Sequence, residues 1–200
     1  VAAVTAQSST PYTDWATGIA FQSYQSARDG FAFGIAVPES PTDEFIGQLV
    51  SPITGWAGVS FGGGMLDNLL LTAWSNNGEI VRAFRMAESY ALPTAYTSTT
   101  PELTALTCGT SVNETHFTLT FTCKNCQTWT TSSNTTGGFD LTGETAVMGW
   151  AYGADAPTDP ADPESDITQH TSFGQFGMLL SSARSADYDS WKECAADGDA

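Results

Sequence analysis

Short β-type runs separated by turn-forming residues dominate this chain, and this pattern most restricts the folds open to it. The runs are six to nine residues long, and hardly any stretch shows the apolar spacing of an amphipathic helix. The predicted strands are residues 18–24, 31–37, 44–50, 55–61, 69–74, 79–86, 116–122, 144–152 and 173–180. Asn76-Asn77-Gly78 predicts a hairpin turn between two of them. We therefore predict an all-β fold, an antiparallel two-sheet β-sandwich of the immunoglobulin-like type.

The chain has 200 residues, which suits one domain with its own core and favours a monomer. We assign residues 1–190 to this domain and residues 191–200 to an acidic tail that leads to a possible linker. Residues 154–166 are rich in proline and aspartate, so they predict an extended surface loop.

The acidic net charge restricts the classes of partner that this protein can bind. The chain carries 22 acidic and 6 basic residues, a formal net charge of −16. A nucleic-acid-binding protein needs a basic face, so we expect no nucleic-acid partner and no anionic membrane surface. No apolar run is long enough to cross a membrane.

The four cysteines favour structural disulfides. One CxxC, Cys123-Lys-Asn-Cys126, and two histidines do not make a zinc ribbon. A redox CxxC belongs at a strand-to-helix turn, whereas this one follows a strand and precedes a Thr/Ser-rich loop. We expect Cys123 to pair with Cys126, which leaves Cys108 and Cys194 as a second pair by elimination.

Several weak signals favour a secreted, extracellular protein. Asn113-Glu-Thr and Asn134-Thr-Thr are glycosylation sequons, and disulfides persist in the same compartment. No signal-peptide pattern begins at Val1, as expected for a mature secreted chain or for a cytosolic one.

Common catalytic motifs are missing from the sequence. There is no G-x-S-x-G elbow, and no pair of carboxylates stands out as a glycosidase site. Gly62-Gly63-Gly64 lies between two strands rather than before a helix, so it is not a phosphate cradle.

The two histidines differ in their surroundings. Alternation places His116 with Thr118, Thr120 and Thr122 on a polar, outward face, which predicts an ordinary surface histidine. His170 lies where the Pro/Asp loop ends and an apolar strand begins, a place where a side chain can be held near a cavity mouth. A hydrogen-bonded structural histidine is the alternative.

Met65 differs from the other methionines. Met86, Met148 and Met178 lie inside predicted strands, but Met65 follows the three glycines, which could let a flat ring approach the backbone. One methionine and one histidine do not suit blue copper but suffice as axial ligands of haem iron. Without a CxxCH motif, such a haem would be non-covalent haem b. A flexible turn before a core methionine is the alternative.

Four segments resemble, in order, the cytochrome domain of fungal cellobiose dehydrogenase, a haem-binding β-sandwich of the iron-reductase group. They are residues 55–74 (GWAGVSFGGGMLDNLLLTAW), 88–96 (ESYALPTAY), 123–129 (CKNCQTW) and 166–177 (DITQHTSFGQFG). The resemblance implies a six-coordinate haem b iron with Met65 and His170 as axial ligands and Tyr90 at a haem propionate. It also implies pairing of the CxxC cysteines. Arg85 could offset propionate charge or form a plain surface ion pair.

The function implied by this resemblance is electron transfer rather than catalysis by the domain alone. A flavin- or quinone-dependent sugar dehydrogenase attached to the domain would reduce it, and it would reduce an acceptor such as a copper polysaccharide monooxygenase. A different class remains open: a secreted carbohydrate-binding module that stacks Trp15, Trp129 or Trp191 on sugar rings.

Overall fold

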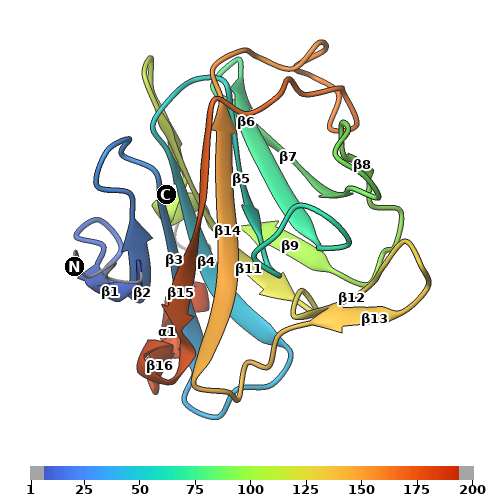
Figure 1. Ribbon diagram of the computed structural model, residues 1–200. Coiled ribbons are helices and arrows are strands. Elements are labelled where there is room, and N and C mark those ends of the chain that lie inside the picture. Colours follow the sequence, from blue (N-terminus) through green and yellow to red (C-terminus); the bar gives the residue numbers. More distant parts are fainter. Residues whose placement is uncertain (1–6, 194–200) are drawn as a thin grey trace, which may run out of the picture.

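The computed structural model describes residues 7–193, which form a β-sandwich (Figure 1). Its strands are β1 Thr10–Thr13, β2 Ala20–Gln25, β3 Ala32–Pro38, β4 Glu44–Ser51, β5 Trp56–Ser60, β6 Leu70–Asn76, β7 Glu79–Met86, β8 Thr94–Ala95, β9 Glu102–Ala105, β10 Ser111–Val112, β11 Phe117–Lys124, β12 Thr128–Thr130, β13 Thr136–Gly138, β14 Thr145–Gly153, β15 Ser172–Leu179 and β16 Arg184–Ser185. Its helical turns are η1 Thr107–Gly109, η2 Leu180–Ala183 and α1 Tyr188–Lys192.

Two sheets form the layers of the sandwich. The β3 sheet has the order β1-β2-β3-β4-β11-β10, with β9 beside β11 and β16 parallel to β3. The β14 sheet has the order β15-β14-β5-β6-β7-β8 and is antiparallel throughout. The hairpin β12–β13 projects beside them (Figure 1). The predicted antiparallel β-sandwich is confirmed.

All nine predicted strands are present, as β2 to β7, β11, β14 and β15, and each end lies within two residues of its prediction. The predicted hairpin is also confirmed, because Asn77 and Gly78 have φ values of 51° and 87° between paired β6 and β7. Positive φ at both central residues is the mark of a type I′ turn. The missed strands are two to four residues long, too short to show alternation.

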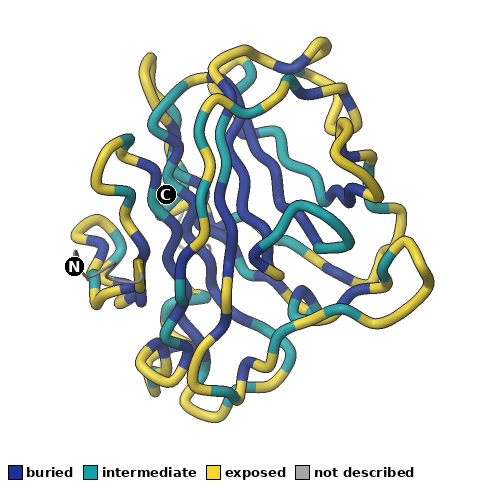
Figure 2. The backbone as a smooth tube through the Cα atoms, in the orientation of Figure 1, coloured by how far each residue is buried: buried dark blue, intermediate teal, exposed yellow. Residues whose placement is uncertain are grey.

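The core lies between the sheets, whose strands carry most of the buried residues (Figure 2). Aromatic side chains from both layers meet there, as Tyr24 of β2 and Phe176 of β15 do with ring centroids 4.4 Å apart. Along β11, Phe117, Leu119 and Phe121 are fully buried, as the alternation predicts, and His116 is exposed. Thr120 was expected to face solvent but is fully buried. Its hydroxyl donates to Gly109 O at 2.7 Å, because η1 folds over this part of the outer face.

The predicted Cys123–Cys126 disulfide is confirmed, and both cysteines are buried in the core. The proposed partner of Cys108, Cys194, lies outside the described residues. No helix within residues 7–193 is long and apolar enough to cross a membrane.

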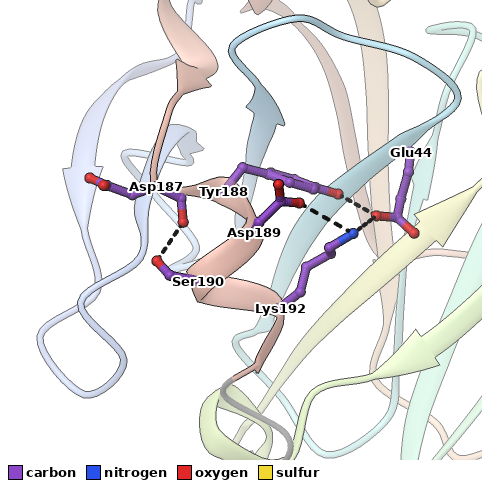
Figure 3. Close-up of polar contacts among 6 residues, drawn as sticks. All are labelled: Glu44, Asp187, Tyr188, Asp189, Ser190 and Lys192. Carbon is purple, nitrogen blue, oxygen red and sulfur yellow. Dashed lines mark hydrogen bonds and ion pairs between the residues drawn. The ribbon is translucent and has the colours of Figure 1, made fainter.

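The end of the described chain docks on β4 through α1 (Figure 3). Tyr188 is 2% exposed, and its hydroxyl donates to Glu44 Oε1 at 3.1 Å. Lys192 Nζ lies 2.9 Å from the same oxygen and 3.6 Å from Asp189 Oδ1. Residue 191, where the predicted tail begins, lies in this helix.

Candidate functional site

The outer face of the β14 sheet carries unusually small side chains at its centre. Met148 and Trp150 point into the core, so Val147, Gly149 and Ala151 point outward. The register places Ser60 and Gly58 of β5 beside Gly149 and Ala151. The register also places Gln175 and Phe173 of β15 on their other side. We call the four small residues Gly58, Ser60, Gly149 and Ala151 the floor of this outer face.

The Met65 loop, residues 61–69, connects β5 to β6 and folds over this floor. Gln175 Nε2 donates to Gly63 O at 2.8 Å, which ties the loop to β15. A Cβ on Gly63 would lie 2.8 Å from Val147 Cγ1, so the loop also lies directly on β14. The loop therefore lies against the outer face of the sheet at Gly63, two residues before Met65.

The backbone on both sides of Met65 is fixed. Asn68 Nδ2 donates to Gly64 O at 3.1 Å and to Leu66 O at 3.0 Å, and Ser60 Oγ donates to Gly64 O at 2.6 Å. Met65 itself is half-buried, whereas the other three methionines are at most 8% exposed, as predicted for core residues. Met65 is thus held in place without belonging to the core.

The glycines before Met65 serve the loop's own fold. A Cβ on Gly62 would overlap the Asn68 side chain, and Gly63 has a φ of +84° that side chains rarely adopt. Gly64 alone has ordinary room around it, its nearest neighbour being Asn68 Nδ2 at 3.5 Å. Gly62 and Gly63 are therefore required by the fold of the loop itself, and the approach of a ring to the triplet stays a prediction.

His170 lies between two anchors in the His170 segment, residues 154–171, which connects β14 to β15. Ile167 is 3% exposed and packs with Trp56 and Trp74, and Thr171 N donates to Tyr152 O at 2.8 Å. The imidazole is half-buried and lies 4.6 Å from the Phe173 ring, centroid to centroid. Because Phe173 is on the outer face, His170 lies at the edge of the same floor.

The segments that carry Met65 and His170 contact β14 at different positions along the strand. The loop before Met65 touches Val147 and Gly149, while His170 is next to Thr171, which bonds to Tyr152. At ~3.3 Å per strand residue, three to five residues separate these positions by about 10–17 Å. This distance leaves room for two side chains that approach a central group from opposite sides.

Tyr90 lies in the Tyr90 segment, residues 87–93, which follows β7. This segment begins beside the Met65 loop, because Leu66 pairs with Ala87 and Asp67 N donates to Ala87 O at 3.0 Å. The Tyr90 side chain is 86% exposed. It is therefore free to reach a group held at the edge of the floor.

Exposed apolar side chains border the same region. Val147 is 60% exposed and Phe173 is 70% exposed on the outer face, and Leu92 of the Tyr90 segment is 49% exposed. Exposed apolar side chains that gather in one region mark a place where a ligand or another chain binds. Small side chains at the centre, apolar ones at the border and a thioether and an imidazole as donors fit a flat apolar metal complex such as haem.

Other features in the described part of the chain do not offer a better metal site. Residues 7–193 contain no group of three or more His, Cys, Asp or Glu that could hold a metal ion. Two surface depressions, of about 470 and 400 Å³, lie beside β12–β13 and β7, and Met65 and His170 line neither.

Arg85 and the tryptophans depart from expectation. Arg85 is 1% exposed, so the predicted surface ion pair is wrong.

Trp129 is 4% exposed and belongs to the core, and Trp191 packs partly buried beside Tyr188. Trp15 is 91% exposed. Burial therefore removes Trp129 as a sugar-stacking residue, whereas Trp15 stays exposed, and stacking through it stays a prediction.

Some residues that hold the site were missed at the level of sequence. Alternation along β15 could have identified Gln175, because it lies between Phe173 and Gly177 on the outer face. The bonds of Trp74 and Arg85 carry no such signal, since their partners Pro160 and Pro163 lie in a segment that only the fold brings near. Asn68 bonds locally, to Gly64 O and Leu66 O, and these bonds depend on the conformation of the loop rather than on a periodic pattern.

An antiparallel sandwich of this shape is the architecture of solved cytochrome domains. The cytochrome domain of Myriococcum thermophilum cellobiose dehydrogenase superposes with a TM-score of 0.84 at 35% identity, covering 94% of this chain and 97% of that one. The cytochrome b domain of pyranose dehydrogenase from Coprinopsis cinerea superposes with a TM-score of 0.83 at 31% identity, covering 95% and 97%.

This chain belongs to the family of cytochrome domains of cellobiose dehydrogenase, whose model matches residues 12–190. It is also 36% identical over 197 residues to a pyrroloquinoline quinone-dependent pyranose dehydrogenase of Coprinopsis cinerea. That match covers 94% of this chain but 26% of the relative, so the chain spans about a quarter of its length. Membership in a cytochrome b domain family implies haem b as the cofactor.

Proposed function

We propose that this domain binds haem b non-covalently between Met65 and His170 and carries single electrons. The observation that carries the proposal is the placement of the two donors. Both are half-buried, and both lie on anchored segments beside the same small-residue floor of the β14 sheet. An axial pair of this kind is sufficient to ligate haem iron.

Each residue has a defined task in this proposal. Bound haem supplies an iron that alternates between two oxidation states. The Met65 thioether and the His170 imidazole would both hold the iron, which would exclude small molecules from the metal and keep the exchange to electrons. Phe173 packs against the imidazole ring and restrains its orientation. Tyr90, exposed on its segment, would donate to a carboxylate of the bound group.

The electron donor is proposed from the length of the relative. Since the chain spans about a quarter of a sugar dehydrogenase, we assign the donor to a flavin- or quinone-dependent sugar dehydrogenase domain of the same protein. A copper polysaccharide monooxygenase, or another acceptor outside the cell, takes the electron. The charge of −16 favours an acceptor with a neutral or basic docking face.

The visible spectrum tests this function. With haem supplied, the reduced protein should show a strong Soret band and sharp low-spin α and β bands. His170→Ala should lose the low-spin bands and most of the haem, because one axial ligand is gone.

The matched control is His116→Ala, since His116 is exposed and lies in the turn between β10 and β11, which belong to the other sheet. This variant should keep the wild-type spectrum. A folded wild-type protein that stays colourless with excess haem, or a His170→Ala variant with an unchanged spectrum, would contradict the proposal.

A further inference from the structure

Arg85 on β7 is 1% exposed, yet it bonds to three separate parts of the chain. Nε donates to Thr72 Oγ1 on β6 at 3.1 Å, and Nη1 donates to Pro93 O at 3.2 Å. Nη2 donates to Pro163 O at 2.9 Å and to Ser165 O at 2.6 Å. One side chain thus connects the β14 sheet, the Tyr90 segment and the His170 segment.

This guanidinium is charged and buried among neutral acceptors. The ion pairs within residues 7–193 both involve Lys192, so Arg85 has no carboxylate in direct contact. The carboxylates of Asp162, Glu164 and Asp166 act on it from a greater distance. Burying a charge this way is costly unless its hydrogen bonds are well made, and four of its five donors are used.

Trp74 adds a further contact between the β14 sheet and the His170 segment. Its ring centroid lies 5.8 Å from the guanidinium carbon of Arg85, and its Nε1 donates to Pro160 O at 2.8 Å. The two side chains therefore hold three carbonyls of the His170 segment, those of Pro160, Pro163 and Ser165. Ile167, buried against Trp74, continues the attachment to within three residues of His170.

The Tyr90 segment is held by the same group, since Pro93 lies three residues after Tyr90. In Figure 1 the orange His170 segment runs along the top and descends beside the green segment near β8. The bonds of Arg85 join these two irregular segments directly, because one guanidinium donates to Pro93 O, Pro163 O and Ser165 O.

We infer that Arg85 is a positioning residue for the haem site, holding the His170 and Tyr90 segments at the separation that lets His170 reach the iron opposite Met65. The inference rests on the proposed function. It assigns Arg85 no direct contact with a propionate, because one remaining donor cannot form the two-bond fork that arginine makes with a carboxylate.

Arg85→Lys and Arg85→Met test the inference on the full chain. Lysine keeps the charge but is a point donor that cannot bond to three segments at once, so it should not rescue the site. Arg82→Met is the matched control: Arg82 is on the same strand, is half-buried and bonds only to Ile80 O, at 3.4 Å. Thr72→Val is a milder variant that removes one partner and keeps Arg85.

Two measurements are needed. In the haem-free protein, amide exchange of residues 154–171 and 87–93 should rise about tenfold in both Arg85 variants, since buried charge-assisted bonds are lost. In the haem-loaded protein, low-spin bands should give way in part to high-spin ones, and haem should dissociate about tenfold faster. Arg82→Met should match the wild type, and Thr72→Val should shift both readouts less, in the same direction.

The outcomes separate the two proposals. A wild-type protein that takes up no haem overturns the proposed function and this inference together. A wild-type protein with a low-spin haem, and an Arg85→Lys variant with the same spectrum and dissociation rate, overturns the positioning role alone. If the Arg85 variants do not fold, Thr72→Val decides: an unchanged spectrum and unchanged exchange contradict the inference.

Discussion

Met65 shows how one side chain can be held firmly outside a core. Its neighbours' carbonyls accept hydrogen bonds from Asn68 Nδ2 and Ser60 Oγ, while its own side chain remains half-buried. A thioether presented this way needs little rearrangement to bind a metal. Preorganised ligands matter for electron transfer, because a site that does not move between oxidation states exchanges electrons with little reorganisation.

At this scale we expect Met65→His to lower the reduction potential of the bound haem. An imidazole is a stronger donor than a thioether and stabilises the oxidised iron, so the potential should fall by roughly 100 mV, well inside the ~0.8 V range set by axial ligands. Redox titration followed by absorbance measures it. Met65→Leu is the companion variant, which should become high-spin. An unchanged potential in Met65→His would mean that Met65 is not the ligand.

At the scale of elements, the fold of the Met65 loop depends on which of its glycines can accept a side chain. A methyl group on Gly62 would overlap the Asn68 side chain, whereas one on Gly64 would meet Asn68 Nδ2 at an ordinary contact distance of 3.5 Å. Asn68 cannot move aside without releasing Gly64 O and Leu66 O. The loop therefore tolerates a side chain at one of these glycines and not at the other.

We expect Gly62→Ala to reduce the free energy of unfolding by about 1–2 kcal/mol, since it displaces Asn68 and its two hydrogen bonds. Gly64→Ala should change it by less than about 0.5 kcal/mol. Urea unfolding of the haem-free protein compares the two variants directly. Equal losses in both would show that Asn68 does not hold the loop.

The helix α1 has a pH-dependent attachment. Burial, with help from the neighbouring Glu44 carboxylate, raises the pKa of Tyr188 far above its ordinary value of 10.0. The hydrogen bond to Glu44 raises the pKa of Lys192 above 10.5. A raised folded pKa means that the stabilisation is complete below the ordinary value and is lost as the pH rises above it.

The free energy of unfolding should therefore fall with rising pH above about 10, and Tyr188→Phe should make this fall shallower because phenylalanine does not ionise. At neutral pH the same variant should lose about 1 kcal/mol with the hydroxyl bond to Glu44. Denaturant unfolding across an alkaline pH series gives both values. Parallel pH profiles for the two proteins would contradict this account of α1.

For the whole molecule, the dominant feature is the net charge of −16. The basic residues number six, and four of them, Arg82, Arg85, Arg184 and Lys192, already bond to other groups within the fold. The field outside the molecule is therefore negative over most directions. Such a field changes the rate of encounter with charged partners more than it changes affinity.

We expect the reduced, haem-loaded domain to react faster with a small cationic metal complex at low salt and faster with an anionic one at high salt. Salt screens the attraction in the first case and the repulsion in the second, over a Debye length of about 10 Å at 0.1 M. Stopped-flow absorbance at several ionic strengths measures both rates. Salt dependences of the same sign for both complexes would contradict electrostatic steering.

Local patterns in the sequence were enough to predict the layers of this fold. Strand alternation, the Asn-Gly turn and the CxxC spacing depend on residues within a few positions of each other, and all were confirmed. The family was also predictable, because four segments in order resembled it, and its model matches residues 12–190. The ligand roles of Met65 and His170 and the contact of Tyr90 with a propionate remain predictions.

Only the tertiary structure decided what holds the site together. Thr120 is buried because η1 covers it, the Met65 loop is tied to the sheet because Gln175, 112 residues away, donates to Gly63 O, and Arg85 is buried because segments up to 80 residues away supply its acceptors. These facts depend on which distant groups meet after the chain has folded. Burial and hydrogen-bond partners at long sequence separation leave no periodic signal, so the sequence determined the sandwich and the candidate ligands, and the fold alone determined what fixes them in place.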